Sequence, residues 1–335
     1  MTSTTHLLVG NPTAQSGKNA ERIEQARAFL SRAGVACDFL ATEPAGRTIA
    51  AVTKAIDERP YRTVVYMGGD GTFREVASGI LGSSRKDAVA MGMLPTGTAN
   101  DQGRSFGLDA GEAALEDNLR VVLAGHETRL DAGRIIAGDH RDWFFDSAGW
   151  GISARVLSER NKDREWIKDV PLLRDVYRDH MVYAGALLRV FLESYAVNDK
   201  FSARVVADGV VHDLEGLTDL IVKGTRIYGG AWVFDRASAH DDGLFEVVPF
   251  HGKRDWTSKA IVDLDGNPLD EEALNAIGVE HTKPFSAKVM DVTIGTYPGG
   301  TPLHAQIDGE EHAAAAAPHV SIEVVQKALR LIVPA

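Results

Sequence analysis

The first hundred residues alternate between short apolar runs and longer amphipathic segments, and this alternation constrains the fold more than any other feature. The runs are five to seven residues long and rich in apolar side chains, as buried strands are. The segments between them repeat apolar residues every three to four positions, which is the period of an α-helix. Such alternation predicts βαβ crossovers and a parallel sheet covered on both faces. We expect strands at 6–10, 35–41, 63–67 and 88–94, and helices at 20–33, 48–58 and 73–81.

Beyond residue 129 the pattern changes to short strand-like runs divided by Gly, Asp, Asn and Pro, which predicts a second, β-rich domain. These runs are 143–148, 201–207, 217–223, 244–249, 287–294 and 303–307. The fold class is therefore α/β plus β, with a doubly wound parallel-sheet domain at 1–130 and a β-rich sandwich domain at 131–319. The apolar segment 320–335 is expected to return to the first domain. An amphipathic insert at 169–195 suits a helix that belongs either to the core or to a lipid-facing surface.

Composition narrows the class of function. The 335 residues carry 47 acidic against 36 basic side chains, a formal net charge of −11, which disfavours broad nucleic-acid binding. The single cysteine, Cys37, excludes an intramolecular disulfide and a multi-cysteine zinc site, and its apolar neighbours indicate a buried strand residue. No apolar run reaches the roughly 18 residues of a membrane span, and no signal-peptide pattern opens the chain. We expect a cytoplasmic protein that would meet a membrane only at its surface.

A glycine-rich loop, Gly68–Thr72, follows one predicted strand directly and precedes a predicted helix. Glycines let the backbone approach a bulky anion, and the free N–H groups at a helix start point at it. Thr72 adds a hydroxyl, while the Asp70 carboxylate can orient an acceptor hydroxyl or the water of a magnesium ion. Asp-Gly is also common turn chemistry, so a plain tight turn is the alternative. The strand–loop–helix context favours phosphate binding.

Two further loops are predicted at the same edge of the sheet. Pro95–Asp101 follows the fourth strand and places Thr98, Asn100 and Asp101 there, with Gly97 allowing close passage of the chain. Asn11-Pro12, with Ser16-Gly17-Lys18 shortly after, ends the first strand. Neither the Walker A motif nor the dinucleotide fingerprint Gly-x-Gly-x-x-Gly matches these loops.

Taken together and in order along nearly the whole chain, these motifs resemble the diacylglycerol kinase catalytic family in its soluble bacterial lipid kinase branch. That branch is related to sphingosine and ceramide kinases and more distantly to NAD kinase. Later segments that share the resemblance are Leu130–Gly133, Tyr228–Gly230, Asp242–Leu244 and Asp308–Glu310. The combination of Pro-x-Gly-Thr-Ala-Asn-Asp with a late Asp-Gly-Glu is the specific part, because other kinases also carry Gly-Gly-Asp-Gly-Thr.

The resemblance implies an NAD kinase-like first domain and transfer of the ATP γ-phosphate to a lipid hydroxyl, most simply that of a diacylglycerol. Glu310 would accept the hydroxyl proton and Asp70 would assist. The ATP site would comprise Asn11, Thr42, Gly68, Gly69, Asp70, Gly71, Thr72, Phe73, Arg74, Gly97, Thr98 and Asn100. The partners implied are ATP and a lipid at a membrane surface, with no nucleic acid; a homodimer is left open.

The resemblance also implies a divalent-ion site, formed by Asp242 with the carbonyl groups of Ala239 and Leu244. Oxygen ligands suit Mg²⁺ or Ca²⁺. From the residues alone, Asp242 could equally belong to a hairpin turn. In the same way, Glu310 could be a solvated turn residue beside Glu311.

Three residues depart from the family pattern. Arg74 and Asp146 stand where relatives commonly have Asn, and Ser153 stands where they have Asp. These departures keep two alternatives open: a soluble-substrate kinase of the NAD kinase type, and a catalytically weak nucleotide- or lipid-binding relative. No residue of the sequence identifies the lipid.

Overall fold

The computed structural model describes residues 5–97, 100–111, 113–155, 157–158, 200–228, 238–252 and 283–335. Expectations for Thr98, Gly229-Gly230 and the insert at 169–195 lie outside these residues. The chain divides into two compact units. The first comprises residues 1–132, 240–242 and 325–335, and the second comprises 133–239 and 243–324. Among the described residues, no helix is long and apolar enough to cross a membrane.

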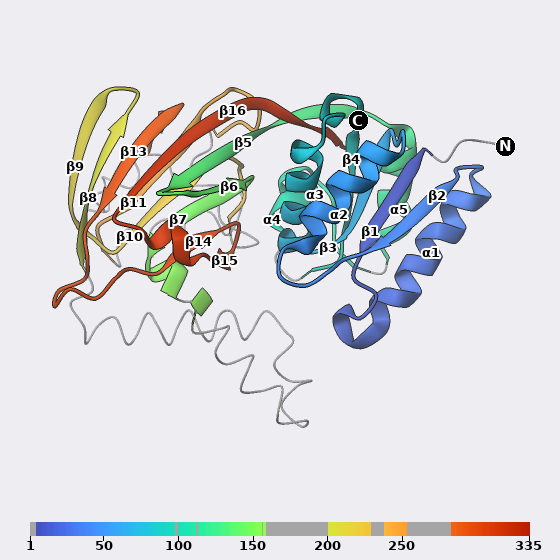
Figure 1. The fold of residues 1–335 in the computed structure, drawn as a ribbon, viewed down its shortest axis with the longest axis horizontal. Coiled ribbons are helices and arrows are strands. Elements are labelled where there is room, and N and C mark those ends of the chain that lie inside the picture. The colour runs from blue at the N-terminus through green and yellow to red at the C-terminus, as the bar shows by residue number, and fades with distance from the viewer. Residues whose placement is uncertain are drawn as a thin grey trace, which may run out of the picture. The chain divides into compact units, whose positions relative to one another are not determined.

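The first unit is built on a parallel sheet with strand order β2-β1-β3-β4, and the last residues of β16 pair in parallel with β4 (Figure 1). Its strands are β1 (His6–Gly10), β2 (Cys37–Ala41), β3 (Thr63–Gly68), β4 (Ala90–Pro95) and the end of β16 (His319–Ile332). Its helices are α1 (Lys18–Arg32), α2 (Arg47–Glu58), α3 (Asp70–Gly82), α4 (Asp101–Ser105) and α5 (Leu115–Ala124), with 3-10 turns η1 (Ala14–Gly17) and η2 (Lys86–Ala88).

Apolar side chains on both faces of this sheet explain why helices cover it. On one face, Val65 and Met67 of β3 pack in a single core with apolar residues of α1 and α5. On the other face, the Tyr66 ring contacts Phe73 of α3 edge-on, with ring centroids 5.4 Å apart. Gly79 lets α2 and α3 pack closely. A Cβ at this position would lie only 2.7 Å from the Cβ of Val52.

The second unit contains two antiparallel layers around one core. One layer has strand order β12-β11-β10-β7-β14-β15, and in the other β16 pairs with β13, β13 with β8, and β8 with β9. The bounds are β5 (Glu127–Ala137), β6 (His140–Phe144), β7 (Ser147–Gly151), β8 (Phe201–Ala207), β9 (Val210–Leu217), β10 (Asp219–Lys223), β11 (Phe245–Phe250), β12 (Phe285–Ala287), β13 (Val289–Ile294), β14 (Ala305–Ile307), β15 (Glu310–Glu311) and a 3-10 turn η4 (Ala313–Ala316). Trp150, Val205, Val222 and Val292 are among the buried residues that both layers contribute to the shared core.

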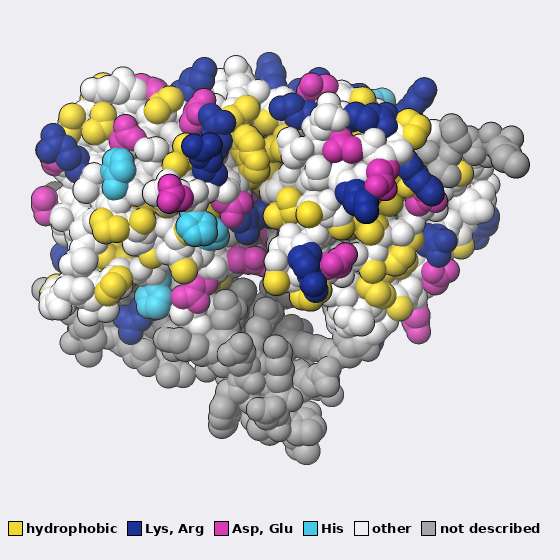
Figure 2. Space-filling model, viewed as in Figure 1, with side chains coloured by type: hydrophobic (Ala, Val, Ile, Leu, Met, Phe, Trp, Pro, Cys, Tyr) yellow, Lys and Arg dark blue, Asp and Glu magenta, His cyan; other side chains and the backbone are white. Residues whose placement is uncertain are grey.

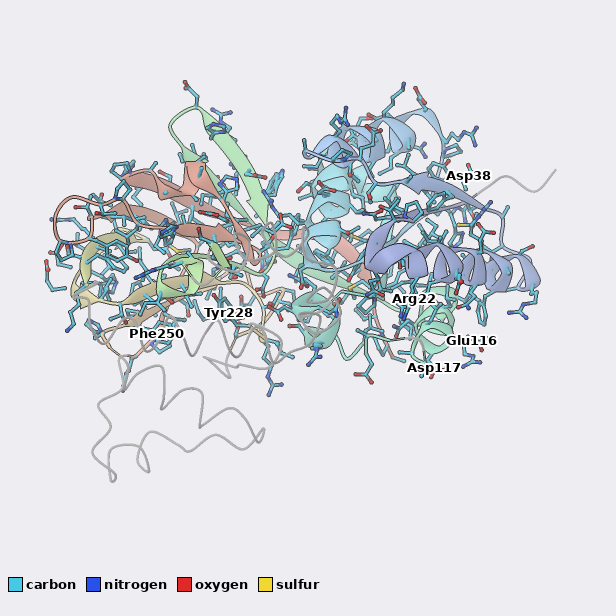
Figure 3. All side chains as sticks on the ribbon, turned by 90° about the horizontal axis from the view of Figure 1, so that it is seen from below. Arg22, Asp38, Glu116, Asp117, Tyr228 and Phe250 are labelled. Carbon is cyan, nitrogen blue, oxygen red and sulfur yellow. The ribbon has the colours of Figure 1, made fainter. Side chains whose placement is uncertain are left out.

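The strand β10 illustrates why strands of this region have nearly continuous apolar sequences. Leu220 and Val222 point into the shared core, while the residue between them, Ile221, packs on the opposite face with Tyr228 and Phe250 (Figure 3). Both faces of the layer therefore carry buried apolar residues, which is why the run lacks the polar alternation of a one-sided strand.

The expected bounds were wrong at several places: the run 287–294 falls on β12 and β13, and the run 217–223 joins the end of β9 to β10. The helix α3 begins at Asp70 and not at residue 73, so Asp70, Gly71 and Thr72 form its first turn. The run 143–148 is not one strand: β6 ends at Phe144 and β7 begins at Ser147. The break has a long-range cause, because the Asp308 side chain accepts the backbone N–H groups of residues 145–147.

Candidate functional site

The register of the parallel sheet brings four loops to one edge. Gly10, the last residue of β1, pairs with Ala41 of β2 and with Met67 of β3. Gly68, the last residue of β3, pairs with Pro95 of β4. The segments that follow these strands therefore start side by side at the carboxyl edge, where ligands of open α/β sheets bind.

Two of these loops touch through glycines. A Cβ built on Gly97 would lie 2.5 Å from the Cα of Gly69, and one on Gly69 would lie 3.3 Å from the Cα of Gly97. The Thr96 N–H donates to the Gly68 carbonyl at 2.8 Å, which fixes the loops to each other. Only residues without a Cβ allow this approach, and the result is a backbone surface free of side chains.

Asn100 closes the second loop on itself. Its Oδ1 accepts the Gly97 N–H at 2.8 Å, and its Nδ2 donates to the Gly97 carbonyl at 2.7 Å. Asn100 has φ +54°, a left-handed conformation that Asn adopts more readily than most residues. The structure therefore gives Asn100 a role in shaping the loop around Gly97.

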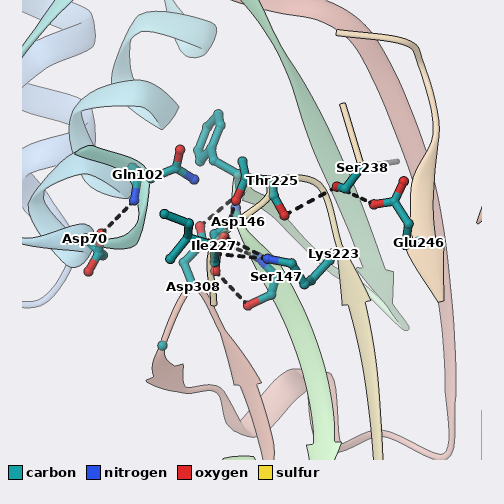
Figure 4. A network of polar contacts seen from close by, with 12 residues as sticks. Asp70, Gln102, Asp146, Ser147, Lys223, Thr225, Ile227, Ser238, Glu246 and Asp308 are labelled. Carbon is teal, nitrogen blue, oxygen red and sulfur yellow. Dashed lines mark hydrogen bonds and ion pairs between the residues drawn. The ribbon is translucent and has the colours of Figure 1, made fainter. Parts of the chain in front are cut away.

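Asp70 lies in the first turn of α3, where the helix dipole favours a negative charge. The Gln102 backbone N–H donates to Asp70 Oδ1 at 3.4 Å (Figure 4). Thr72 and Arg74 follow in the same helix and are partly buried, and Phe73 is buried. Sequence reasoning missed Gln102, whose only signal was its place next to Asn100 and Asp101.

The first and second strands contribute smaller contacts at this edge. The Thr42 N–H donates to the Gly10 carbonyl at 3.0 Å. The Asn11 carboxamide Oδ1 accepts from the backbone and the hydroxyl of Thr13, and the Asn11 carbonyl accepts from Asn19 Nδ2 at 2.7 Å. The Gln15 side chain donates to the carbonyl of Thr96, which ties the loop after β1 to the loop after β4.

In the second unit, Asp308 and Gly309 form the hairpin turn between β14 and β15. Both have positive φ, +47° and +75°, as the two-residue type I′ turn requires. Glu310 follows at the start of β15 and is exposed, and its neighbour Glu311 lies 3.5 Å from the His304 ring. Locally, the arrangement is the hairpin turn that the sequence left open as an alternative.

Asp308 itself is a structural anchor that the sequence did not reveal. It is 5% exposed, and its carboxylate accepts the N–H groups of Phe145, Asp146 and Ser147 at 2.8 to 3.1 Å. Gln306, fully buried, accepts the Gly309 N–H at 2.9 Å and donates to Ser147 Oγ at 3.2 Å. The turn that carries Glu310 is therefore held from both of its sides.

Asp146 forms a buried ion pair behind this turn. Lys223 Nζ lies 3.7 Å from Asp146 Oδ1, with the two side chains 2% and 5% exposed (Figure 4). Thr225 and Ser147 donate their hydroxyls to the same carboxylate, and Lys223 also donates to the Ile227 carbonyl at 2.9 Å. In the sequence, Asp146 stands out only as a departure from the family pattern, and Lys223 only as a lone lysine at the end of the strand-like run 217–223.

Ser153, which departs from the family pattern, is paired with a buried carboxyl group. Its N–H and hydroxyl donate to Asp219 at 3.0 and 3.1 Å. Burial raises the pKa of Asp219 to about 8, and the hydrogen bonds from Ser153 and from the Leu220 backbone oppose this rise only in part. β10 thus supplies a carboxyl group beside the position where Ser153 lacks one.

The residues proposed for the divalent ion divide between the units. Asp242 groups with the first unit, and Ala239 and Leu244 with the second. In the first unit, the segment 240–242 is anchored by Asp131, whose N–H donates to the His240 carbonyl at 2.8 Å. Within the described part of the chain, no group of three or more His, Cys, Asp or Glu side chains could hold a metal ion.

Charged side chains are mixed on the molecular surface. On the face shown in Figure 2, basic and acidic residues are interspersed, and no broad field of one sign covers either unit.

Comparison with known proteins shows which proteins this chain is similar to. Residues 5–135 match the sequence model of the diacylglycerol kinase catalytic domain. A crystal structure of a diacylglycerol kinase from Bacillus anthracis str. Sterne shares the fold, with a TM-score of 0.68 and 17% identity over 100% of this chain and 98% of that one. Another structure from the same strain gives 0.69 and 18% over the same shares. The chain thus has the fold of diacylglycerol kinase-like proteins, a parallel sheet with helices and a separate antiparallel β sheet.

The relatives found by sequence similarity are also diacylglycerol kinases. The chain is 30% identical over 152 residues to a diacylglycerol kinase of Staphylococcus aureus (strain bovine RF122 / ET3-1), covering 45% of each chain. It is 29% identical over 152 residues to that of Staphylococcus saprophyticus subsp. saprophyticus, covering 45% of this chain and 47% of the relative. These matches span about half the length of the relatives. The expected resemblance to the diacylglycerol kinase catalytic family is confirmed, and the family match covers residues 5–135.

Proposed function

We propose that this chain is a lipid kinase that transfers the γ-phosphate of ATP to the hydroxyl of a diacylglycerol-type lipid. The observation that carries the proposal is the contact of Gly69 with Gly97 at the carboxyl edge of the sheet, next to Asp70. This contact lies within the segment that matches the family. An NAD kinase-like topology of the first domain belongs to the same proposal.

The edge of the first unit suits the phosphates of ATP. The N–H groups of the first turn of α3 have no partner within the helix, and the positive end of the helix dipole lies with them. The glycines leave the backbone open to a phosphate, and Thr72 and Arg74 add a hydroxyl and a cation. The proposed ATP site keeps all the expected residues: Asn11, Thr42, Gly68, Gly69, Asp70, Gly71, Thr72, Phe73, Arg74, Gly97, Thr98 and Asn100.

Phosphoryl transfer depends mainly on positioning and on neutralising charge. Asp70 fits a magnesium ion because it offers a carboxylate beside the anion-binding turn, and Mg²⁺ would neutralise charge on the phosphates there. Glu310 would accept the proton of the lipid hydroxyl, a contribution typically worth about 10²–10⁴-fold in rate. The buried anchors around Asp308 would keep the turn of Glu310 in one conformation.

A second divalent ion, Mg²⁺ or Ca²⁺, is proposed at Asp242 with the carbonyl groups of Ala239 and Leu244. The support is chemical: one carboxylate and two carbonyl oxygens are ligands of hard cations, and Gly243, with φ +84°, turns the chain between them. If this is so, Asp242→Asn should lower the melting-temperature increase caused by added Mg²⁺.

The test of the proposed function compares three acceptors. ATP consumption is measured with diacylglycerol in phosphatidylcholine vesicles, with NAD and with fructose 6-phosphate. Turnover with the vesicles alone supports a lipid kinase that works at a membrane surface from the cytoplasm. Turnover with NAD or with the sugar phosphate overturns it in favour of a soluble-substrate kinase. ATP binding without any turnover indicates a non-catalytic relative.

A further inference from the structure

Two buried glutamines of this chain differ in their hydrogen bonding. Gln102 is 1% exposed, and among the described residues neither its Oε1 nor its Nε2 has a hydrogen-bond partner. Gln306 is fully buried, and both ends of its carboxamide are paired. Native proteins pair almost all buried polar groups, so the unpaired carboxamide of Gln102 calls for a physical reason.

The position of Gln102 supplies that reason. It is the second residue of α4 and directly follows Asn100 and Asp101. Its own N–H donates to Asp70 Oδ1 at 3.4 Å, which places its backbone beside the carboxylate at the start of α3 (Figure 4). The backbone of Gln102 therefore lies at the edge where the phosphate loops meet, and its carboxamide, which extends away from Asp70, is buried without a hydrogen-bond partner among the described residues (Figure 4).

The chemistry of the carboxamide restricts its ligand. Nε2 donates and Oε1 accepts, so pairing both atoms requires a group that can accept and donate at once. The oxygens of the ATP phosphates are acceptors only, and they would leave Oε1 unpaired. A hydroxyl group satisfies both atoms.

We propose that the Gln102 carboxamide binds the acceptor hydroxyl of the substrate and helps to select hydroxyl-bearing acceptors. This inference rests on the proposed function and adds a binding residue to the proposed site. It assigns to Gln102 the binding and orientation of the hydroxyl.

The first measurement uses stability without substrate. Replacing Gln102 by Met removes an unpaired buried amide and keeps the size of the side chain, so the melting temperature should rise by about 2–4 °C. Gln306→Met is the matched control: it removes two satisfied hydrogen bonds and leaves the Gly309 N–H unpaired, so the melting temperature should fall by a similar amount or more. A fall for Gln102→Met comparable to that control would overturn the inference.

The second measurement is kinetic. With diacylglycerol in phosphatidylcholine vesicles, Gln102→Met should lower kcat/KM for the lipid about 10-fold, the effect of leaving a substrate hydroxyl unpaired. The Kd for ATP, measured by calorimetry, should stay within about 2-fold, because the phosphates do not need this amide. An unchanged kcat/KM for the lipid, or an equal loss of ATP affinity, would contradict the assignment.

The two measurements separate the inference from the proposed function. If the wild-type chain does not phosphorylate diacylglycerol, the proposed function fails. A raised melting temperature of Gln102→Met then still supports an amide reserved for a ligand, and a lowered one overturns it.

Discussion

In the second unit the Asp308 carboxylate accepts three backbone N–H groups, whereas in the first unit the equally buried carboxamide of Gln102 pairs with nothing among the described residues. An unpaired buried polar group costs about 1–3 kcal/mol of stability. The Asp308 carboxylate avoids this cost for three backbone N–H groups, whereas the Gln102 carboxamide bears it. The saturated region, Asp308 with residues 145–147, is therefore held in one conformation. The unsaturated region, Gln102 with the loops of Gly69 and Gly97, keeps an unpaired amide, which lowers the stability of the free protein and which we assign to a ligand.

The same difference appears in the backbone. Around Asp308 the loop 145–147 is fixed by a carboxylate, while Gly69 and Gly97 approach each other through backbone atoms.

The largest effect is expected at the exposed end of the saturated region. Glu310→Gln should lower turnover of the lipid by about 10²–10⁴-fold, because the amide cannot accept the hydroxyl proton. Stability should be unchanged, because Glu310 is exposed. Glu311→Gln is the control next to it and should keep nearly full turnover. Equal behaviour of the two variants in a steady-state assay would refute the role of Glu310.

Asp308→Ala should be the most destabilising single change in this region. It leaves the buried N–H groups of residues 145–147 without their acceptor, at a cost of about 3–5 kcal/mol of unfolding free energy. Urea denaturation measures this cost, with Glu310→Gln as the control of unchanged stability. A loss below about 1 kcal/mol would show that the anchor is dispensable.

At the unsaturated edge, the two glycines should differ in their tolerance of a methyl group. Gly97→Ala places a Cβ 2.5 Å from the Gly69 backbone and should weaken ATP binding about 10-fold or more, because the loops must separate. Gly69→Ala meets the opposite loop at 3.3 Å and should weaken it only about 2-fold. Calorimetric titration with ATP gives both values; a larger effect at Gly69 would contradict the packing.

The smallest effect concerns pH. The pKa of Asp219 is raised from 3.8 to about 8, so the folded chain binds more protons than the unfolded chain between these values. The stabilisation from the neutral carboxyl group is therefore complete below about pH 4 and declines as pH rises towards 8. Asp219→Asn cannot ionise, so its melting temperature relative to wild type should increase by a few degrees from pH 6 to pH 9. A constant difference would show that Asp219 is already ionised at pH 6.

Local patterns allowed much of the first unit to be predicted. The strand expected at 63–67 and the helix expected at 48–58 differ from β3 and α2 by one residue each, because both elements bury a regular apolar face. The first turn of α3, Asp70–Thr72, is not visible in the sequence pattern, because a glycine-rich segment after a strand is also typical of a loop. β5 was missed because its sequence 127–137 begins with alternating charged residues.

Long-range contacts limit how much of the candidate site can be predicted from the sequence. Asp308 binds residues about 160 positions earlier in the chain, and no local pattern predicts which N–H groups lack other partners. The strand expected at 143–148 failed for this same reason. Gln102 shows the second limit: a sequence shows that an amide is present near a motif, but only packing shows that it is buried and unpaired.

The pairing of β16 with β4 has a consequence for how this protein is made. Arg330 lies opposite Ala90, about 240 residues later in the chain, so β4 stays an open sheet edge while the intervening segment is being translated. The first unit therefore cannot fold completely as the nascent chain emerges, and its final strand must close a very long loop.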